Sequence, residues 1–125
     1  MDRLTWLEAE LALAPDRVTL LALHHPPVTT GILAWDEIGL SVEDRRGLGE
    51  VLQRHPQVRR VVAGHVHRTI AAELAGRAVL AVPSTYMQAR LSFNSDEIEV
   101  VAEPPGFAVH AVLDGELASH VQPVS

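Results

Sequence analysis

The chain has no cysteine and no lysine among its 125 residues, and aromatic residues make up only 4% of it. Without cysteine it can form no disulfide bond, no zinc site with thiolate ligands and no thiol nucleophile. Its hydrophobic core must therefore be built mainly from aliphatic side chains. Apolar residues make up 47% of the sequence, which is enough for a globular fold.

The sequence also lacks a long apolar run and an excess of positive charge. Its longest largely apolar stretch, residues 18–23, is much too short to cross a bilayer, and no signal-peptide pattern opens the chain. The formal net charge of -6 disfavours binding to a nucleic acid backbone, although a bound metal ion can reverse the local field for a small phosphate. We therefore expect a cytoplasmic protein with neither nucleic acid nor a membrane as partner.

Hydrophobic periodicity predicts one α/β unit over residues 1–125. Apolar residues at helical spacing predict helices, with Asp2 capping the first of them. Continuous apolar runs predict buried strands, and Asp114-Gly115 predicts a tight hairpin turn. The predicted helices are 3–14 and 42–54, and the predicted strands are 17–23, 58–63, 69–75, 77–82, 97–102, 106–113 and 116–122. The loop 24–41 between them is long, and loops of that length in compact domains are usually functional.

Four of the seven histidines form two short motifs, each directly after a predicted buried strand. Residues 24–27 read His-His-Pro-Pro, and residues 64–67 read Gly-His-Val-His. Imidazole is the commonest metal ligand among protein side chains, and ligand sites in open α/β sheets lie beyond the carboxyl ends of the strands. The two motifs therefore predict a metal site where the two strands end.

The second motif suggests how its histidines would converge. In an extended segment, residues i and i+2 point the same way, so His65 and His67 can face one metal ion, or two ions about 3.5–4 Å apart as in two-metal hydrolases. Gly64 lets the chain turn sharply before them. Trp35, in the loop 24–41, is assigned a packing role ahead of a role in lining a substrate pocket.

The order of these motifs, with about forty residues between them, resembles the last two metal motifs of calcineurin-like metallophosphoesterases. The resemblance is strongest to the bacterial cyclic-nucleotide and glycerophosphodiester phosphodiesterases, and it extends to Trp6-Leu7-Glu8, to residues 81–85 and to residues 105–120. It implies that residues 1–125 form the C-terminal portion of such a domain. The implied fold is part of a four-layer α/β/β/α sandwich with mixed sheets and flanking helices.

The resemblance also implies roles for the histidines. His24 and His65 would bind one metal ion and His67 a second ion, while His25 would face the substrate or support a ligand, or would itself be the ligand in place of His24. The family uses two divalent ions, Mn, Fe or Zn, and a hydroxide that bridges them attacks the phosphorus atom. The implied substrate is a small phosphodiester of the 3',5'-cyclic-nucleotide or glycerophosphodiester type.

The sequence departs from the family pattern in its acidic ligands. The family's Asp-x-His, Gly-Asp and Gly-Asn-His motifs do not occur in these 125 residues, and nothing in the spacing of Asp36, Glu37, Glu43 and Asp44 makes them substitutes. Three neutral imidazoles without a carboxylate do little to offset the repulsion between two cations. We therefore expect at most one metal ion to bind tightly, and weak phosphodiester hydrolysis or none.

Two further interpretations remain beside the hydrolase. The chain could be a non-catalytic remnant that binds a metal or a partner, or a module with a single metal ion held by His24, His65, His67 and water. In the family fold both halves of the domain contribute strands, so this portion alone would expose an apolar sheet face or edge. A homo-oligomer is therefore expected.

Overall fold

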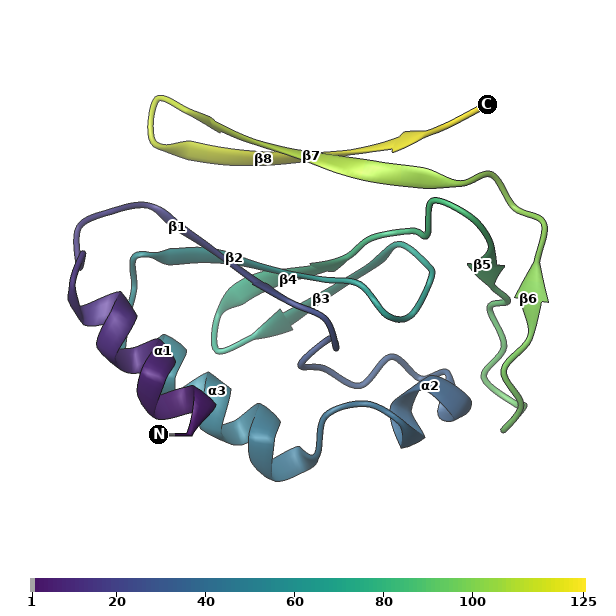
Figure 1. Cartoon of the computed structure of the whole chain (residues 1–125), viewed down its shortest axis with the longest axis horizontal. Helices are drawn as coiled ribbons and strands as arrows, with labels where there is room; N and C mark the ends of the chain where they lie inside the picture. Colours follow the sequence, from purple (N-terminus) through teal and green to yellow (C-terminus); the bar gives the residue numbers. More distant parts are fainter. Residues whose placement is uncertain (1) are drawn as a thin grey trace.

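The computed structural model describes residues 2–125 as a mixed α/β arrangement of helices over a central sheet, with a long hairpin on the sheet's other side (Figure 1). The helices and strands follow in this order: α1 (Arg3–Ala12), β1 (Thr19–Leu23), α2 (Leu33–Glu37), α3 (Val42–Arg54), β2 (Val58–Ala63), β3 (Ile70–Leu74), β4 (Arg77–Ala81), β5 (Gln88–Ala89), β6 (Val100–Val101), β7 (Gly106–Leu113) and β8 (Glu116–Pro123). The expected α/β class with mixed strands and flanking helices is confirmed. No helix within this described range is both long enough and apolar enough to cross a membrane.

The central sheet has the strand order β1-β2-β4-β3, with β1, β2 and β4 parallel and β3 antiparallel to β4. In the register of β1 and β2, Leu23 lies opposite Ala63. These are the last residues before the two histidine motifs. The carboxyl ends of two neighbouring parallel strands therefore deliver both motifs to the same edge of the sheet, as the sequence predicts.

Helices α1 and α3 cover one face of this sheet (Figure 1). Leu11 of α1 and Leu52 of α3 pack with Val58, Val61 and Val79 of the strands in one hydrophobic cluster. Asp2 caps α1 by accepting a hydrogen bond from the Thr5 N–H at 2.9 Å, as expected. Burial of aliphatic side chains at these contacts provides the main stabilisation of this layer.

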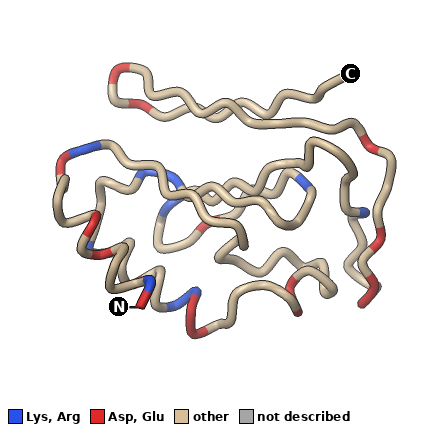
Figure 2. The backbone as a smooth tube through the Cα atoms, in the orientation of Figure 1, with Lys and Arg blue, Asp and Glu red and all other residues tan. Residues whose placement is uncertain are grey.

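The long hairpin β7–β8 lies over the opposite face of the sheet (Figure 1). Asp114 and Gly115 form the turn of this hairpin, with φ angles of 51° and 81°. A type I′ turn requires positive φ angles at both of its central residues. Figure 2 shows acidic residues at this turn and an otherwise uncharged pair of arms. Arg60 of β2 reaches up to the hairpin, donating hydrogen bonds to the Ser119 hydroxyl and to the Leu117 carbonyl.

The structure differs from the sequence prediction mainly in two loops. The loop 24–41 contains the short helix α2, and the segment from Pro83 onward contains β5, which pairs with β6. The predicted strand 97–102 shortens to the two residues of β6. Each of these elements spans five residues or fewer, too few to show a helical or strand periodicity in the sequence.

Candidate metal centre

His24 and His65 meet directly at the adjoining ends of β1 and β2. The Gly64 N–H donates to the His24 carbonyl at 3.0 Å, which ties the two strand ends together. The Nε2 atom of His24 then lies 3.1 Å from the Nδ1 atom of His65. Two ring nitrogens at this distance are close enough to share a proton or to bind one metal ion.

His25 completes a cluster of three imidazoles with these two residues. One ring nitrogen from each of His24, His25 and His65 lies within 4.8 Å of the others. The ring centroid of His25 is 4.4 Å from that of His65 and 4.9 Å from that of His24. Both roles predicted for His25, that of a metal ligand and that of a residue facing the substrate, are compatible with this position and remain predictions.

The chain reaches this arrangement through a strained turn rather than an extended segment. His65 and His67 have φ angles of 68° and 48°, a region in which each non-glycine residue costs about 1–3 kcal/mol. The Val66 N–H donates to the Gly64 carbonyl at 2.8 Å across His65, and the Val66 side chain is buried. The expectations that the motif is extended and that Gly64 makes the sharp turn are therefore wrong. The histidines themselves adopt the left-handed conformation, in which His is enriched among non-glycine residues.

His67 lies outside the three-imidazole cluster but is held firmly in place. Its Nδ1 atom is 2.9 Å from the Met87 carbonyl, and its own carbonyl accepts a hydrogen bond from the Ala89 N–H at 2.9 Å. Metal-binding histidines commonly donate one ring N–H to a backbone carbonyl, which leaves the other ring nitrogen to bind the metal. Its predicted role as a ligand of a second ion remains a prediction.

His65 has the electrostatic character of a metal ligand. Burial lowers the pKa of His65, and repulsion from His25, His24 and His67 lowers it further, so the neutral form that binds metals is favoured. Its Nε2 atom is buried and has no hydrogen-bond partner among residues 2–125. A buried ring nitrogen without a partner, beside two other imidazoles, fits a site for a divalent ion that prefers nitrogen ligands.

The acidic residues near the cluster in sequence serve other purposes in the structure. Asp36 accepts hydrogen bonds from Thr30 and Gly31, and Asp44 is bonded to Ser41 at the start of α3. Asp44 does share with His24 a groove of about 390 Å³ next to α1. Within residues 2–125 the cluster of potential ligands contains imidazoles alone.

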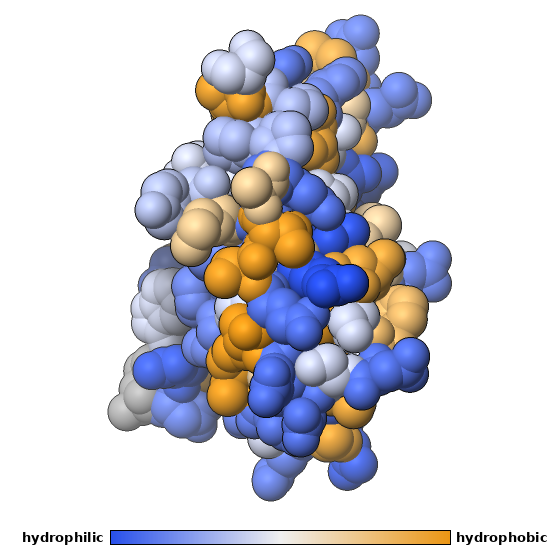
Figure 3. Space-filling view, turned by 90° about the vertical axis from the view of Figure 1, so that its right-hand side faces the viewer, coloured by the Kyte–Doolittle hydropathy of each residue, from blue (hydrophilic) through white to orange (hydrophobic). Residues whose placement is uncertain are grey.

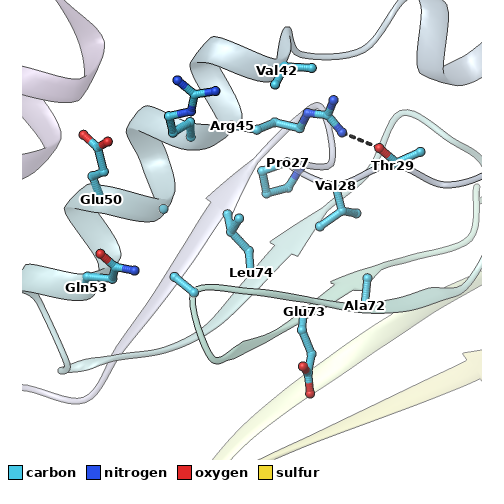
Figure 4. A pocket seen from close by; sticks show the side chains of 13 residues that line it. Pro27, Val28, Thr29, Val42, Arg45, Glu50, Gln53, Ala72, Glu73 and Leu74 are labelled. Carbon is cyan, nitrogen blue, oxygen red and sulfur yellow. Dashed lines mark hydrogen bonds between the residues drawn. The ribbon is translucent and has the colours of Figure 1, made fainter.

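A wider groove of about 700 Å³ lies between α3 and β3, behind the loop that leaves the cluster (Figure 4). Arg45 of α3 crosses its upper edge and donates to the Thr29 hydroxyl at 2.6 Å. Figure 4 shows this contact bracing the segment that follows Pro27. The groove contains none of the clustered histidines, so we assign Arg45 a supporting role for the loop rather than a role in the site.

Trp35 is the site residue whose contacts the sequence does not predict. It is buried, and its ring lies edge to face with His65 at a centroid distance of 5.1 Å and stacks on His67 at 5.7 Å. The packing role predicted for Trp35 is therefore correct, but its partners are the histidines of the second motif. A tryptophan in a long loop beside a histidine motif is the only signal that the sequence offers for this contact.

Comparison with curated proteins finds several related phosphodiesterases. The chain is 36% identical over 122 residues to the 3',5'-cyclic adenosine monophosphate phosphodiesterase CpdA of Escherichia coli. The aligned region covers 95% of this chain and 42% of that enzyme. It is 37% identical over 110 residues to a probable glycerophosphodiester phosphodiesterase, GpdQ, of Arcobacter nitrofigilis, covering 87% of this chain and 40% of that protein. The chain thus spans about two-fifths of the length of these relatives.

Solved structures give a consistent result. A dimetal phosphatase from Danio rerio matches 65% of this chain and 26% of its own chain, with a TM-score of 0.50 and 27% identity. No family model matches the sequence. The similarity that the two histidine motifs predict is confirmed by these relatives, along nearly the whole chain.

Proposed function

This chain belongs to the calcineurin-like metallophosphoesterases, and we propose that it supplies the histidine ligands of a metal-dependent phosphodiesterase. The observation that carries the proposal is the 3.1 Å approach of His24 Nε2 to His65 Nδ1 at the ends of two parallel strands. The names of the relatives, which are cyclic-nucleotide and glycerophosphodiester phosphodiesterases, support a small phosphodiester as substrate.

In this proposal each histidine has a separate task. His24 and His65 hold one divalent ion, and His67 offers Nε2 to a second ion while Met87 fixes its ring through Nδ1. A bound ion supplies positive charge for the phosphoryl oxygens and acidifies water. His25 lies beside the pair, where it either contacts the substrate or acts as a ligand.

The donor set also limits what this chain can do by itself. Three imidazoles carry no negative charge to offset two neighbouring cations. We therefore propose that residues 1–125 bind one Mn, Fe or Zn ion tightly and hydrolyse phosphodiesters weakly or not at all. Full activity would need acidic ligands from outside these residues.

Calorimetric titration of the purified chain with Mn²⁺ or Zn²⁺ tests the metal site. We expect one tight site, which His65→Ala weakens by at least about 100-fold because even a residue supporting a ligand contributes about 10- to 100-fold. His120→Ala, an exposed histidine on β8, is the control and should bind as the unmodified chain does. Absence of binding would contradict the metal site, and two tight sites would contradict the one-ion limit.

A chromogenic phosphodiester with added Mn²⁺ tests the activity. The chain should be weakly active or inactive alone, and more active when mixed with the remaining portion of a related phosphodiesterase. Equal activity of His24→Ala and the unmodified chain in that mixture would exclude His24 from the reaction. Calorimetry of His25→Ala beside this assay distinguishes the two roles of His25: loss of both metal binding and hydrolysis indicates a ligand, whereas loss of hydrolysis alone indicates a residue that contacts the substrate.

The all-imidazole cluster also favours a second function, a module that binds a single metal ion without catalysis. Three histidines with water resemble the ligand set of several zinc sites. One bound ion with no hydrolysis in the mixture would support this function over the phosphodiesterase.

A further inference from the structure

We propose that Trp35 is a positioning residue that holds the imidazoles of His65 and His67 in the orientation needed for metal binding. This inference rests on the proposed metal site, but the orientation of the His65 and His67 rings can be measured in the metal-free chain. Trp35 touches both histidines of the second motif with one ring, edge to face at 5.1 Å and stacked at 5.7 Å.

The first reason is that the turn needs an external support. His65 and His67 both have left-handed backbone conformations, which persist only where the surrounding structure enforces them. Hydrogen bonds from Val66 and Ala89 fix the backbone of the turn. These bonds do not fix the side-chain torsion angles of the two imidazoles. Each ring has one nitrogen beside a partner, Met87 O for His67 and His24 Nε2 for His65, and Trp35 adds a ring contact to both.

The second reason is the orientation of His65. Its Nε2 atom has no hydrogen-bond partner in the described part of the chain, so no hydrogen bond from these residues orients that end of the ring. Aromatic pairs in edge-to-face geometry are directional because the ring edge is positive and the ring face negative. The contact with Trp35 can therefore help to orient the Nε2 end of the imidazole, while Nδ1 lies against His24.

The third reason is that Trp35 is itself anchored from two sides. Its side chain packs with Ile32, Val66 and Ala89 in a hydrophobic cluster separate from the core under α1 and α3. On the other side, the neighbouring Asp36 accepts hydrogen bonds from the N–H groups of Thr30 and Gly31 at 2.8 and 2.9 Å.

A brace from α3 completes this anchoring. Arg45 holds Thr29, the residue before the Asp36-bonded segment (Figure 4). Residues 29–36 therefore form a clamp, in which Asp36 holds the backbone of Thr30 and Gly31, Arg45 holds the Thr29 side chain, and Trp35 packs against the two histidines.

Two substitutions separate this role from ordinary core packing. Trp35→Phe keeps an aromatic face at the position, whereas Trp35→Leu keeps an apolar side chain without one. Val79→Ala is the matched control, because Val79 is buried in the other cluster, away from the histidines. It lowers stability without removing a ring contact.

The first measurement uses the metal-free chain. Assigned nuclear magnetic resonance spectra should show the ring protons of His67 moving downfield in Trp35→Leu, because the shielding of the stacked indole is lost. The same signals should stay close to their original positions in Val79→Ala. Asp36→Asn, which weakens the clamp and leaves Trp35 in place, should shift the His67 signals in the same direction and provides the test if Trp35→Leu does not fold.

The second measurement is Mn²⁺ affinity by calorimetry. We expect Trp35→Leu to bind about 10-fold more weakly, within the range found for residues that orient metal ligands, and Trp35→Phe to recover most of that loss. Equal affinity and unchanged histidine signals in Trp35→Leu would overturn the inference, as would an equal loss in Val79→Ala. If the unmodified chain bound no metal, the proposed function would fail, and the spectra alone would still decide whether Trp35 holds the two rings.

Discussion

His110 forms a small polar cluster between the hairpin and the sheet, remote in sequence from the metal motifs. Its Nδ1 atom lies 2.7 Å from the Ser119 hydroxyl, to which Arg60 also donates. Burial lowers the pKa of His110 from its ordinary value of 6.5, and the positive charge of Arg60 lowers it further. The folded chain therefore favours the neutral ring.

This lowered pKa predicts a loss of stability in acid. As the pH falls below about 6.5, the unfolded chain takes up a proton at His110 more readily than the folded chain, so the free energy of unfolding decreases until the pH falls below the lower folded pKa. His110→Asn should make the melting temperature less dependent on pH between about 7.5 and 5. Thermal melts at several pH values test this, with the exposed His120→Asn as control; identical slopes for both variants would contradict it.

The residue scale also shows what the sequence could and could not predict about the site. His24 and His65 converge because each follows a strand that pairs with the other, and apolar runs in the sequence predict both strands. The left-handed conformation of His65 and His67 was not predictable, because it occurs together with tertiary contacts, the burial of Val66 and the packing of Trp35. Such contacts join residues thirty positions apart and leave no periodic signal.

At the scale of elements, one ion pair fastens α1 to α3. Glu8 accepts two hydrogen bonds from the Arg54 guanidinium, at 2.5 and 2.8 Å, and lies 3.2 Å from the His55 ring. The hydrogen bonds from Arg54 lower the pKa of Glu8 to about 2. The bidentate geometry makes this pair stronger than most surface ion pairs.

We expect Glu8→Gln to lower the melting temperature at neutral pH, because the neutral amide loses the charged pair with Arg54. The sign follows from the lowered pKa. The stabilisation is present above the unfolded value of about 4.5 and is lost as the pH falls towards about 2. The difference between Glu8→Gln and the unmodified chain should therefore be largest near pH 7 and vanish near pH 2. Glu10→Gln, exposed on the same helix, is the matched control; an equal effect in both variants would argue against the pair.

The elements themselves were predicted wherever a local signal exists. Asp114-Gly115 correctly predicted the turn of the hairpin β7–β8. The bounds of α3 also match the prediction, despite Gly47 within the helix. A Cβ atom at Gly47 would lie 2.6 Å from Leu4 Cδ1, so this glycine, which weakens the helix, also lets α1 approach. Helix α2 was missed because it depends on tertiary packing of Trp35 rather than on its own five residues.

At the scale of the whole molecule, apolar side chains lie exposed on several surfaces. Figure 3 views the β5–β6 side and shows apolar residues among polar ones; Leu91 and Phe93 of this segment are 52% and 60% exposed. Val109 and Val112 of the hairpin are also about half exposed. Apolar side chains exposed at several places favour association of the chain with another protein surface.

The free edge of β1 is a specific candidate for that association. Strand β1 is at the end of the sheet and reads Thr-Leu-Leu-Ala-Leu, with no charged residue or proline to block pairing with another strand. Its Leu20 is 37% exposed. The groove of about 390 Å³ along β1 and α1 is lined mainly by apolar residues, with Arg3, Asp44 and two histidines among them. Two copies of the chain could pair through this edge as an antiparallel extension of both sheets.

We therefore predict that the chain forms concentration-dependent homo-oligomers through β1. Leu20→Lys should shift sedimentation velocity profiles towards the monomer, because a charge on an edge strand disfavours strand pairing. Leu13→Lys makes the same chemical change at a residue that is 78% exposed just after α1 and outside β1, and should leave the profiles unchanged. If both variants dissociate the oligomer equally, general hydrophobicity rather than the β1 edge drives association. A stable monomer of the unmodified chain at all concentrations would exclude the edge as a site of self-association.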